Sequence, residues 1–436
     1  MKRFIISIFL KRLYYQRLAI VRDGILRLSL RGSRREPKQS QGGLRVISGD
    51  CHALRARNDK RPYFFSFLVL LFPLILLANN YEFGPSIRVN DDSAGSCYHG
   101  TTKRSIGCRG DTVYLAWTDD RNGSPLWDNS RIYFSKSIDA GNTWSPNIMI
   151  SLDLDTLFCR NQSIVLDYFS NIYVAYGGFS QNDNDRDVYF TKSTDGGSSF
   201  TPSIMVNDSA VVKWQVLGSI AVNSGGQYVY VVWEDSRNGH DENIYLARST
   251  DGGMSFLPSV RVNDGVDSAD QWYPVIACDN SGQYVYVAWQ DSRDTLHGGD
   301  VYFSRSTDYG QMFQPDICVN DTATTGYTKQ GNPTMYYYDG IIHIAWRDER
   351  DDFTIYYNRS TDGGISFGVD TKVRDDTNGA GMYPIIAADD SGRIYLVWED
   401  SRTFGSTGYD IYFSFSDDSG TTFKPDVRVN DLLGMS

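Results

Sequence analysis

The sequence predicts an all-β fold, a six-bladed β-propeller whose blades are four-stranded antiparallel sheets. Three observations support this prediction: a repeated unit, strand-type periodicity within each unit, and a turn motif that occurs once per unit. The motif is Ser-x-Asp-x-Gly-x-Ser/Thr-aromatic or a close variant, and its first serines are separated by 56, 56, 57, 54 and 56 residues. Such regular spacing indicates one supersecondary unit repeated around a ring, not independent domains. The six copies are residues 137–144, 193–200, 249–256, 306–313, 360–367 and 416–423.

Each unit contains four short segments with the two-residue alternation of β-strands. In the third unit, YVYVVWED (228–235) is followed by NIYLARS (243–249), then by the turn motif, then by PSVRVND (258–264). A shorter apolar run precedes each such group, for example PVIACD (274–279) in the fourth unit. Gly, Asn and Asp connect the segments and no helical periodicity is present, so the unit is typical of a propeller blade. The strands are called a to d from the axis outward.

The repeated aspartate of the turn has a structural explanation. Its short side chain can accept hydrogen bonds from the backbone amides of the turn, and the glycine two residues later permits a positive φ. The closing aromatic ring can pack between strands c and d. One reaction centre does not need six equivalent carboxylates, which favours the structural interpretation. These residues are Asp139, Asp195, Asp251, Asp308, Asp362 and Asp418.

The six octapeptides resemble the Asp-box, or bacterial neuraminidase repeat, and their number is similar to that of the sialidase superfamily of six-bladed propellers. The resemblance covers roughly residues 85–431. It implies Asp-boxes between strands c and d, on the face away from the active site. For enzymes of the family it implies three arginines around a substrate carboxylate, a tyrosine nucleophile assisted by a glutamate, and an aspartate acid/base. The usual Phe/Tyr-Arg-Ile-Pro motif is absent, since residues 85–92 read PSIRVNDD; no catalytic residue is therefore assigned.

If the c–d turns occupy one face, the b–c and d–a connections occupy the other, because neighbouring strands run antiparallel. Carboxylates and arginines crowd these connections and make this face polar and anionic in balance. Five b–c connections begin with Asp-x-Arg, whose guanidinium can donate two hydrogen bonds to a carboxylate or bind sugar hydroxyls. A repeated salt bridge between loop and neighbouring blade is the alternative, and the repetition favours it. The arginines are Arg121, Arg237, Arg293, Arg350 and Arg402.

The entrance to strand a differs between units, unlike most of the repeat. Aromatic and amide side chains there would converge on the central channel, where they suit sugar rings, which stack on apolar faces and hydrogen-bond at their edges. Packing of the inner strands is the alternative. By the sialidase resemblance alone, Tyr98, Tyr273 and Tyr383 are conceivable nucleophiles. The predicted ligand-binding residues are Tyr98, Trp214, Gln215, Gln271, Trp272, Tyr273, Gln330, Asn332 and Tyr383.

The closure of the ring is left open by the sequence. Segments of d type number seven, against six copies of a, b and c, so either the first or the last is redundant or the array was cut before another blade. An N-terminal strand that completed the final blade would close the ring. The seven segments contain Ile87, Ile148, Ile204, Val260, Ile317, Thr371 and Val427.

The N-terminal residues differ from the repeats. Residues 63–78 form an uncharged apolar run after two basic residues, which predicts a secretory signal cleaved near Ala78 or, alternatively, a signal anchor. About sixty residues precede this run, which is unusual for a signal. We therefore expect residues 1–61 to be a basic leader or the product of a misassigned start, residues 62–80 to be the signal, and residues 81–436 to be the exported propeller.

The charge of the chain and the spacing of its potential metal ligands limit which partners and metal ions the sequence predicts. Residues 1–80 carry 16 Lys and Arg against 4 Asp and Glu, whereas residues 81–436 carry 26 against 49, a net charge of −23. This acidic body would repel phosphate backbones, so no nucleic-acid partner is expected. No Cys/His cluster predicts zinc, although the acidic loop at 177–187 could hold calcium if it is not simply a solvated turn.

Two function classes remain. The first is a non-catalytic surface module that binds a glycan or a protein at the mouth of the propeller. The second is a glycoside hydrolase of the exo-α-sialidase type. The absent Arg-Ile-Pro motif and the near-uniform repeats favour the first class, while the divergent entrances to strand a keep the second open.

Overall fold

A computed structural model of the chain describes residues 3–6, 19–22, 25–26, 81, 83–91, 97–98, 105–121, 130–151, 158–180, 186–208, 214–239, 241–265, 269–294, 298–321, 328–376, 378–389 and 391–430. The chain divides into two compact units, residues 31–81 and residues 1–30 with 82–436. Among the residues described here, no helix is both long and apolar enough to cross a membrane. The predicted signal at 62–80 lies outside the described residues. So does the predicted leader, except for a small sheet of β1 (Arg3–Ile6), β2 (Ala19–Arg22) and β3 (Ile25–Leu26).

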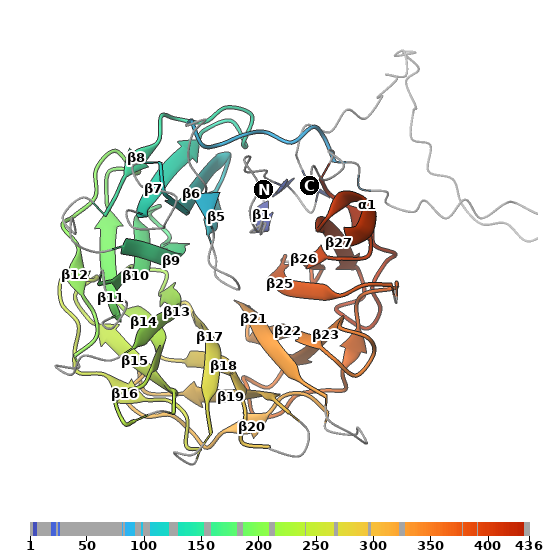
Figure 1. Cartoon of the computed structure of the whole chain (residues 1–436). Coiled ribbons are helices and arrows are strands. Elements are labelled where there is room, and N and C mark those ends of the chain that lie inside the picture. The colour runs from blue at the N-terminus through green and yellow to red at the C-terminus, as the bar shows by residue number, and fades with distance from the viewer. Residues whose placement is uncertain are drawn as a thin grey trace, which may run out of the picture. The chain divides into compact units, whose positions relative to one another are not determined.

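Six antiparallel sheets follow one another around a central axis, each with strands a to d in chain order (Figure 1). In the first blade strand a is divided into β4 and β5, which both pair with β6. The predicted six-bladed β-propeller of four-stranded blades is thus confirmed. The first three blades consist of β4 (Cys97–Tyr98), β5 (Ile106–Arg109), β6 (Thr112–Asp119), β7 (Arg131–Ser137) and β8 (Ile148–Met149); β9 (Phe158–Leu166), β10 (Ile172–Phe179), β11 (Arg186–Ser193) and β12 (Ile204–Met205); and β13 (Gln215–Val222), β14 (Val229–Asp235), β15 (Asn243–Ser249) and β16 (Val260–Arg261). The last three consist of β17 (Gln271–Cys278), β18 (Val285–Asp291), β19 (Asp300–Ser306) and β20 (Ile317–Cys318); β21 (Gln330–Tyr338), β22 (Ile341–Asp348), β23 (Thr354–Ser360) and β24 (Thr371–Lys372); and β25 (Gly381–Ala388), β26 (Ile394–Asp400), β27 (Asp410–Ser416) and β28 (Val427–Arg428).

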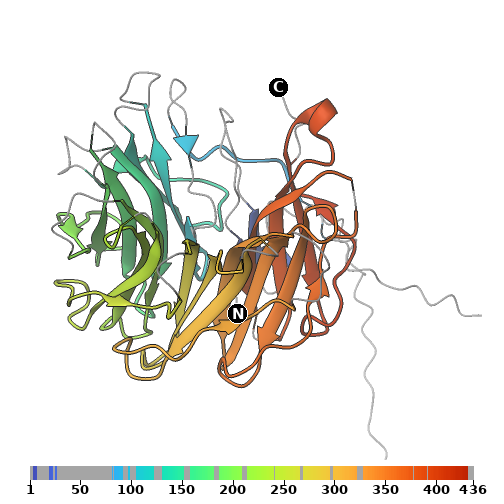
Figure 2. The same cartoon turned by 60° about the horizontal axis from the view of Figure 1, so that its bottom comes forward.

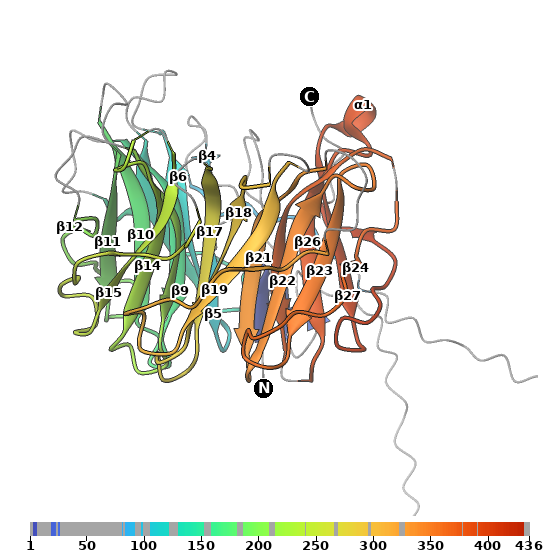
Figure 3. The ribbon, with the colours of Figure 1, turned by 90° about the horizontal axis from the view of Figure 1, so that it is seen from below.

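The strand connections gather on two faces, because neighbouring strands run antiparallel (Figures 2 and 3). The a–b and c–d turns lie on one, here called the Asp-turn face after its six Ser-x-Asp turns. The b–c and d–a connections lie on the other, here called the mouth face, which includes the short helix α1 (Phe404–Thr407). Strand a is innermost in each blade and lines the central channel (Figure 1).

The core lies between blades rather than within them, since a single sheet cannot cover its own faces. All seven residues of β14 are buried, as are those of β18 and β26. Between the second and third blades, for example, Tyr173 and Phe190 pack with Val231 and Trp233. Five b-strand indoles are fully buried in this way: Trp117, Trp233, Trp289, Trp346 and Trp398.

The Ser-x-Asp turns have the hydrogen bonds that the sequence predicts. In the third blade Asp251 accepts bonds from Ser249 Oγ at 2.7 Å, from Ser255 N at 3.0 Å and from Ser255 Oγ at 2.6 Å. Gly253 has a φ of 82° and donates its N–H to Ser249 Oγ at 2.8 Å. Burial raises the pKa of Asp251, but the hydrogen bonds from Ser249 and Ser255 outweigh this and lower that pKa to about 2.

These turns also connect neighbouring blades, which the sequence did not predict. The ring of Phe256 lies 5.3 Å from that of Phe190 on strand c of the preceding blade, rather than only within its own hairpin. On the same strand, Lys192 Nζ donates to the carbonyl oxygen of Gly252 in the turn at 2.7 Å. This strand-c cation therefore ties each blade to the next. The five ties are Lys136 to Gly196, Lys192 to Gly252, Arg248 to Tyr309, Arg305 to Gly363, and Arg359 to Ser419.

The sixth blade differs at the equivalent positions. Strand c carries Phe415 in place of the cation, and Phe413 packs edge-on against Phe83, with ring centroids 5.6 Å apart. Residues 83–91 form no strand, and β28 is strand d of this blade. Hydrogen bonds between Asp91 and Asn147 connect the N-terminal segment to the first blade. The first of the seven d-type segments is therefore a bridge at the closing seam, not a strand of the final blade.

The turn hydrogen bonds predict a stability difference between two adjacent acids. Asp418 accepts bonds from Ser416 and from Thr422 N and Oγ1, whereas Asp417 forms only a half-exposed ion pair with Lys424 among the contacts described. Asp418→Ala is expected to lower the free energy of unfolding by about 1–2 kcal/mol, and Asp417→Ala by under about 0.5 kcal/mol. Urea denaturation of both variants checks this. Equal losses would contradict the role given to the turn.

Candidate functional site

The five arginines of the Asp-x-Arg repeat occupy one recurring network on the mouth face. In the fourth blade, Arg293 donates to Asp291 at 2.7 Å and to Asp316 at 2.6 Å, and its guanidinium lies 4.1 Å from the centroid of the Tyr302 ring. Asp291 is fully buried and also accepts a bond from Trp289 Nε1 at 2.9 Å. The contacts to buried Asp and to Tyr recur at Arg121, Arg237, Arg350 and Arg402. They support the architectural explanation, and ligand binding by these arginines stays a prediction.

In three of these arginine networks, two aspartates are paired with each other. Asp264 and Asp316 each accept the other's backbone N–H, at 3.1 and 3.0 Å. Burial and the neighbouring Asp264 raise the pKa of the Asp316 carboxyl to about 7, although Arg293 opposes this. Near neutral pH the pair therefore shares one proton. Asp321 with Asp370 and Asp375 with Asp426 are arranged alike, while Asn147 and Ser259 occupy the second position in the first and third blades.

Strand a carries an irregularity near the mouth in several blades. The pairing register with strand b shifts there in β9, β17, β21 and β25. At the equivalent position in each, a residue other than glycine has a positive φ between 51° and 58°. Such a bulge redirects a side chain, and the backbone conformation costs about 1–3 kcal/mol, which is typical of functional sites. The four residues are Asn161, Tyr273, Asn332 and Tyr383, of which the sequence predicted the last three.

The last variable position of strand b lies beside this ring of bulges. It precedes the repeated Asp and differs from blade to blade. Glu234 is buried there and accepts the backbone N–H of Tyr273 from the next blade at 2.7 Å. Thr118 similarly donates to Gln162 of the second blade at 2.8 Å. This ring was not predicted, although variation beside an Asp that recurs in five blades was a visible signal. Its members are Thr118, Gly177, Glu234, Gln290, Arg347 and Glu399.

Tyr273 lies where groups from several blades meet. Its side chain is 36% exposed. Burial raises the pKa of the phenol, the nearby Glu234, Tyr383 and Glu242 raise it further, and Arg347 lowers it. These groups come from the third, fifth and sixth blades, so Tyr273 reaches the axis of the mouth. The surroundings of Tyr273 thus include a second phenol, two carboxylates and a guanidinium.

The other predicted ligand residues separate into two kinds. Gln215, Gln271 and Gln330 are buried, and their amides bond to groups at the ends of the strands, such as the carbonyl oxygen of Ala269 at 2.7 Å from Gln271 Nε2. Trp214 is 45% exposed, and Trp272 donates its Nε1 proton to Glu242. The side chain of Tyr98 lies outside the described residues. Of the predicted ligand residues whose side chains are described, Trp214 and Tyr273 are thus the exposed ones, and Trp272 is half-buried.

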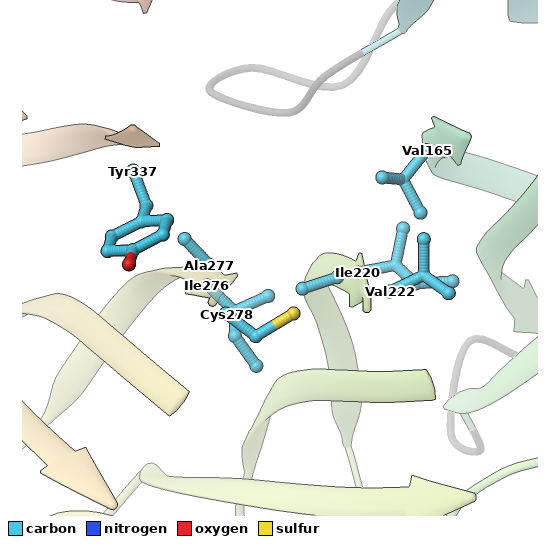
Figure 4. A pocket seen from close by; sticks show the side chains of 8 residues that line it. Val165, Ile220, Val222, Ile276, Ala277, Cys278 and Tyr337 are labelled. Atoms are coloured by element: carbon cyan, nitrogen blue, oxygen red, sulfur yellow. The ribbon is translucent and has the colours of Figure 1, made fainter. Parts of the chain in front are cut away.

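A pocket lies in the channel nearer the Asp-turn face (Figure 4). Apolar side chains from β9, β13, β17 and β21 line it, among them Val165, Ile220 and Ile276, with Cys278 and Tyr337 at its edge. None of the predicted ligand residues lines it.

No metal centre is built by the described residues. Within them, no group of three or more His, Cys, Asp or Glu side chains could hold a metal ion. Residues 181–185 of the predicted calcium loop lie outside the described part of the chain, so calcium binding there stays a prediction.

Comparisons with known proteins concern the fold. No family model and no curated protein matches the sequence. An ulvan lyase, a polysaccharide lyase, is similar with a TM-score of 0.53 and 12% identity over 76% of this chain and 84% of the lyase. A protein of unknown function from Dyadobacter fermentans has a TM-score of 0.51 and 15% identity over 73% and 94% of the two chains. NanB sialidase from Streptococcus pneumoniae has a TM-score of 0.48 and 10% identity over 73% of this chain and 66% of the sialidase, just under two thirds of its length.

The fold and these neighbours define the class of protein. The chain is a six-bladed propeller whose structural neighbours are sialidases and related six-bladed propeller enzymes. At such low identities the likeness shows the fold alone. Residue roles must therefore come from this chain's own mouth.

The acid pairs predict a specific pH dependence of stability. Folding raises the pKa of Asp316 to about 7 from an ordinary value of 3.8. Between pH 3.8 and pH 7 this carboxyl therefore binds a proton more strongly in the folded state than in the unfolded state. The free energy of unfolding then falls as pH rises toward 7, by up to about 1.4 kcal/mol per pH unit for each proton. Asp316→Asn, which copies the first blade's Asn147, is expected to flatten this dependence between pH 5 and pH 8 in urea titrations.

The reciprocal change provides the control for this experiment. Asn147→Asp installs the missing acid opposite Asp91 and is expected to steepen the same dependence. Parallel pH profiles for both variants and the unaltered protein would show that the pairs share no proton.

Proposed function

We propose that this chain is an exported, non-catalytic binding module that holds a glycan at the mouth of its propeller. The observation that carries the proposal is the position of Tyr273, which is 36% exposed on the mouth face while its backbone N–H is held by Glu234 of the third blade at 2.7 Å. Aromatic faces flanked by hydrogen-bonding groups are suited to sugar rings. The carbohydrate-active names among the structural neighbours agree with this choice. A protein is the alternative ligand, because the polar residues of the mouth face would also suit a protein surface.

Glycoside hydrolysis of the exo-α-sialidase type is the second candidate function. It is favoured by one observation, the proximity of Tyr273 to Glu234 and Arg347, since sialidases use a tyrosine nucleophile. Against it, the five repeated arginines are already engaged with buried Asp. Binding without turnover is therefore the function proposed first.

Export rests on the sequence alone. The apolar run at 63–78 and the acidic body after it motivate the proposal of a secreted or surface-anchored protein. Fractionation of the producing cells, with N-terminal sequencing of the recovered protein, tests it. Recovery only from the cytosol would refute export.

Two tyrosines of the fourth blade provide a matched test of glycan binding. Tyr273 on the mouth face is 36% exposed, and Tyr284 on the Asp-turn face is 39% exposed. On a glycan array followed by calorimetry, Tyr273→Ala is expected to weaken binding at least about tenfold, a loss of about 1.4 kcal/mol, and Tyr284→Ala to leave it unchanged. Equal effects of the two changes, or no binding to any glycan, would refute the mouth as a glycan site.

Turnover assays separate the two candidate functions. Fluorogenic sialosides incubated with the unaltered protein are expected to release no aglycone. Release that Tyr273→Phe abolishes, while binding persists, would replace the binding module with the hydrolase.

A further inference from the structure

Contacts between cations and aromatic rings on the mouth face are of two kinds. The repeated kind places each Asp-x-Arg guanidinium over the strand-c tyrosine of its own blade, as Arg293 lies over Tyr302. The other contacts do not repeat from blade to blade. Among them, Arg186 lies 4.2 Å from the Trp214 ring centroid, Lys329 Nζ lies 5.5 Å from that of Trp272, and Arg347 lies 4.7 Å from that of Phe353. Blade architecture explains the first kind. It offers no reason for the second.

Two of the non-repeated contacts, Arg186 with Trp214 and Lys329 with Trp272, lie along one arc. Arg186 begins β11 in the second blade, and its backbone forms an isolated parallel bridge with Trp214, which precedes β13 in the third. Glu242 of the third blade feels the charge of Arg186 and accepts the Nε1 proton of Trp272 in the fourth. Lys329 precedes β21 in the fifth blade, and its ammonium group lies over the ring of the same Trp272. The arc therefore crosses four adjacent blades.

The chemistry of the arc alternates between flat apolar faces and positive charges. Indole faces stack on the C–H faces of sugar rings, and Trp214 is 45% exposed. Arg and Lys supply donors that suit carboxylate and sulfate oxygens. Arg186 and Lys329 belong to a propeller that is acidic in balance, since residues 81–436 carry 26 Lys and Arg against 49 Asp and Glu. Glu242 fixes one indole, and its remaining acceptor capacity suits a sugar hydroxyl.

We propose that the arc formed by Arg186, Trp214, Glu242, Trp272 and Lys329 binds an extended acidic polysaccharide. Sugar rings stack on the two indoles, and carboxylate or sulfate groups of successive sugars pair with Arg186 and Lys329. Because the indoles and cations are spread over neighbouring blades, the ligand is a stretch of polymer and not a single terminal sugar. This inference rests on the proposed glycan-binding function and specifies its ligand class.

The test compares three polymers and one monomer with the full chain. Polygalacturonate supplies carboxylates, dextran sulfate supplies sulfates, and dextran supplies neither; galacturonate is the monomer. By calorimetry, at least one acidic polymer is expected to bind at least about tenfold more tightly than dextran and than galacturonate. The acidic polymer that binds identifies the anion, and added salt is expected to weaken that binding.

Variants assign the binding to the arc. Lys329→Gln and Trp272→Ala are each expected to raise the Kd for the acidic polymer at least about fivefold. Lys424→Gln, which removes one positive charge from an exposed ion pair with Asp417, is the control and is expected to change the Kd less than twofold. Circular dichroism verifies that each variant is folded. If Trp272→Ala is not folded, Lys329→Gln alone decides.

The outcomes separate this inference from the function on which it rests. Equal binding of dextran and the acidic polymers, or binding that neither arc variant weakens, overturns the arc but leaves a glycan-binding mouth. Tight binding of the monomer overturns the extended ligand. If no polymer and no arrayed glycan binds, both proposals fail.

Discussion

A buried carboxylate at the end of strand b holds five of the six blades together. In the fourth blade this is Asp291, which accepts an indole N–H, a backbone amide and a guanidinium. A buried charge is tolerated only when it is paired and hydrogen-bonded, so its partners cannot be changed independently. This explains why Trp-x-Asp-x-Arg occurs in five blades with little variation. The neighbouring positions, which make no such demand, are free to differ.

The sequence predicted the fold well because the repeat and the strand periodicity are both local signals. The six turns and the two-residue alternation specify the blade without any long-range information. The roles of the repeated Asp and Gly also followed from local turn chemistry. The contact of Phe256 with Phe190 did not, because it joins residues of different blades. Sequence patterns within one unit do not show which surface of the next unit it meets.

The site was predicted only in part, for the same reason. Divergence at the entrance to strand a drew attention to Tyr273, Trp272 and Trp214, whose role in binding stays a prediction. Arg186 and Lys329 were overlooked, since the repeated Asp-x-Arg motif appeared to be the main source of guanidinium groups. Glu234 was overlooked because its bond to Tyr273 N crosses from one blade to another. The bulge at Tyr273 depends on a register shift that no hydrophobic pattern reveals.

The strained backbone at the mouth is maintained by contacts between blades. Tyr273 has a φ of 54°, and a non-glycine residue keeps such a conformation only where its surroundings enforce it. Here the carboxylate of Glu234 accepts the backbone N–H of that residue. The side chain is thereby directed before any ligand arrives, which reduces the ordering cost of binding.

All three seams that the cation–aromatic arc crosses have the strand-c tie. Between the second and fifth blades, each seam has its strand-c cation on the next Asp turn, from Lys192 and Arg248 to Arg305. The closing seam, between the sixth and first blades, has Phe415 in place of that cation. A platform that spans several blades can bind a stiff polymer only if the blades hold their distances. The ties on the Asp-turn face therefore serve the binding groups on the opposite face, and the irregular seam lies away from the arc.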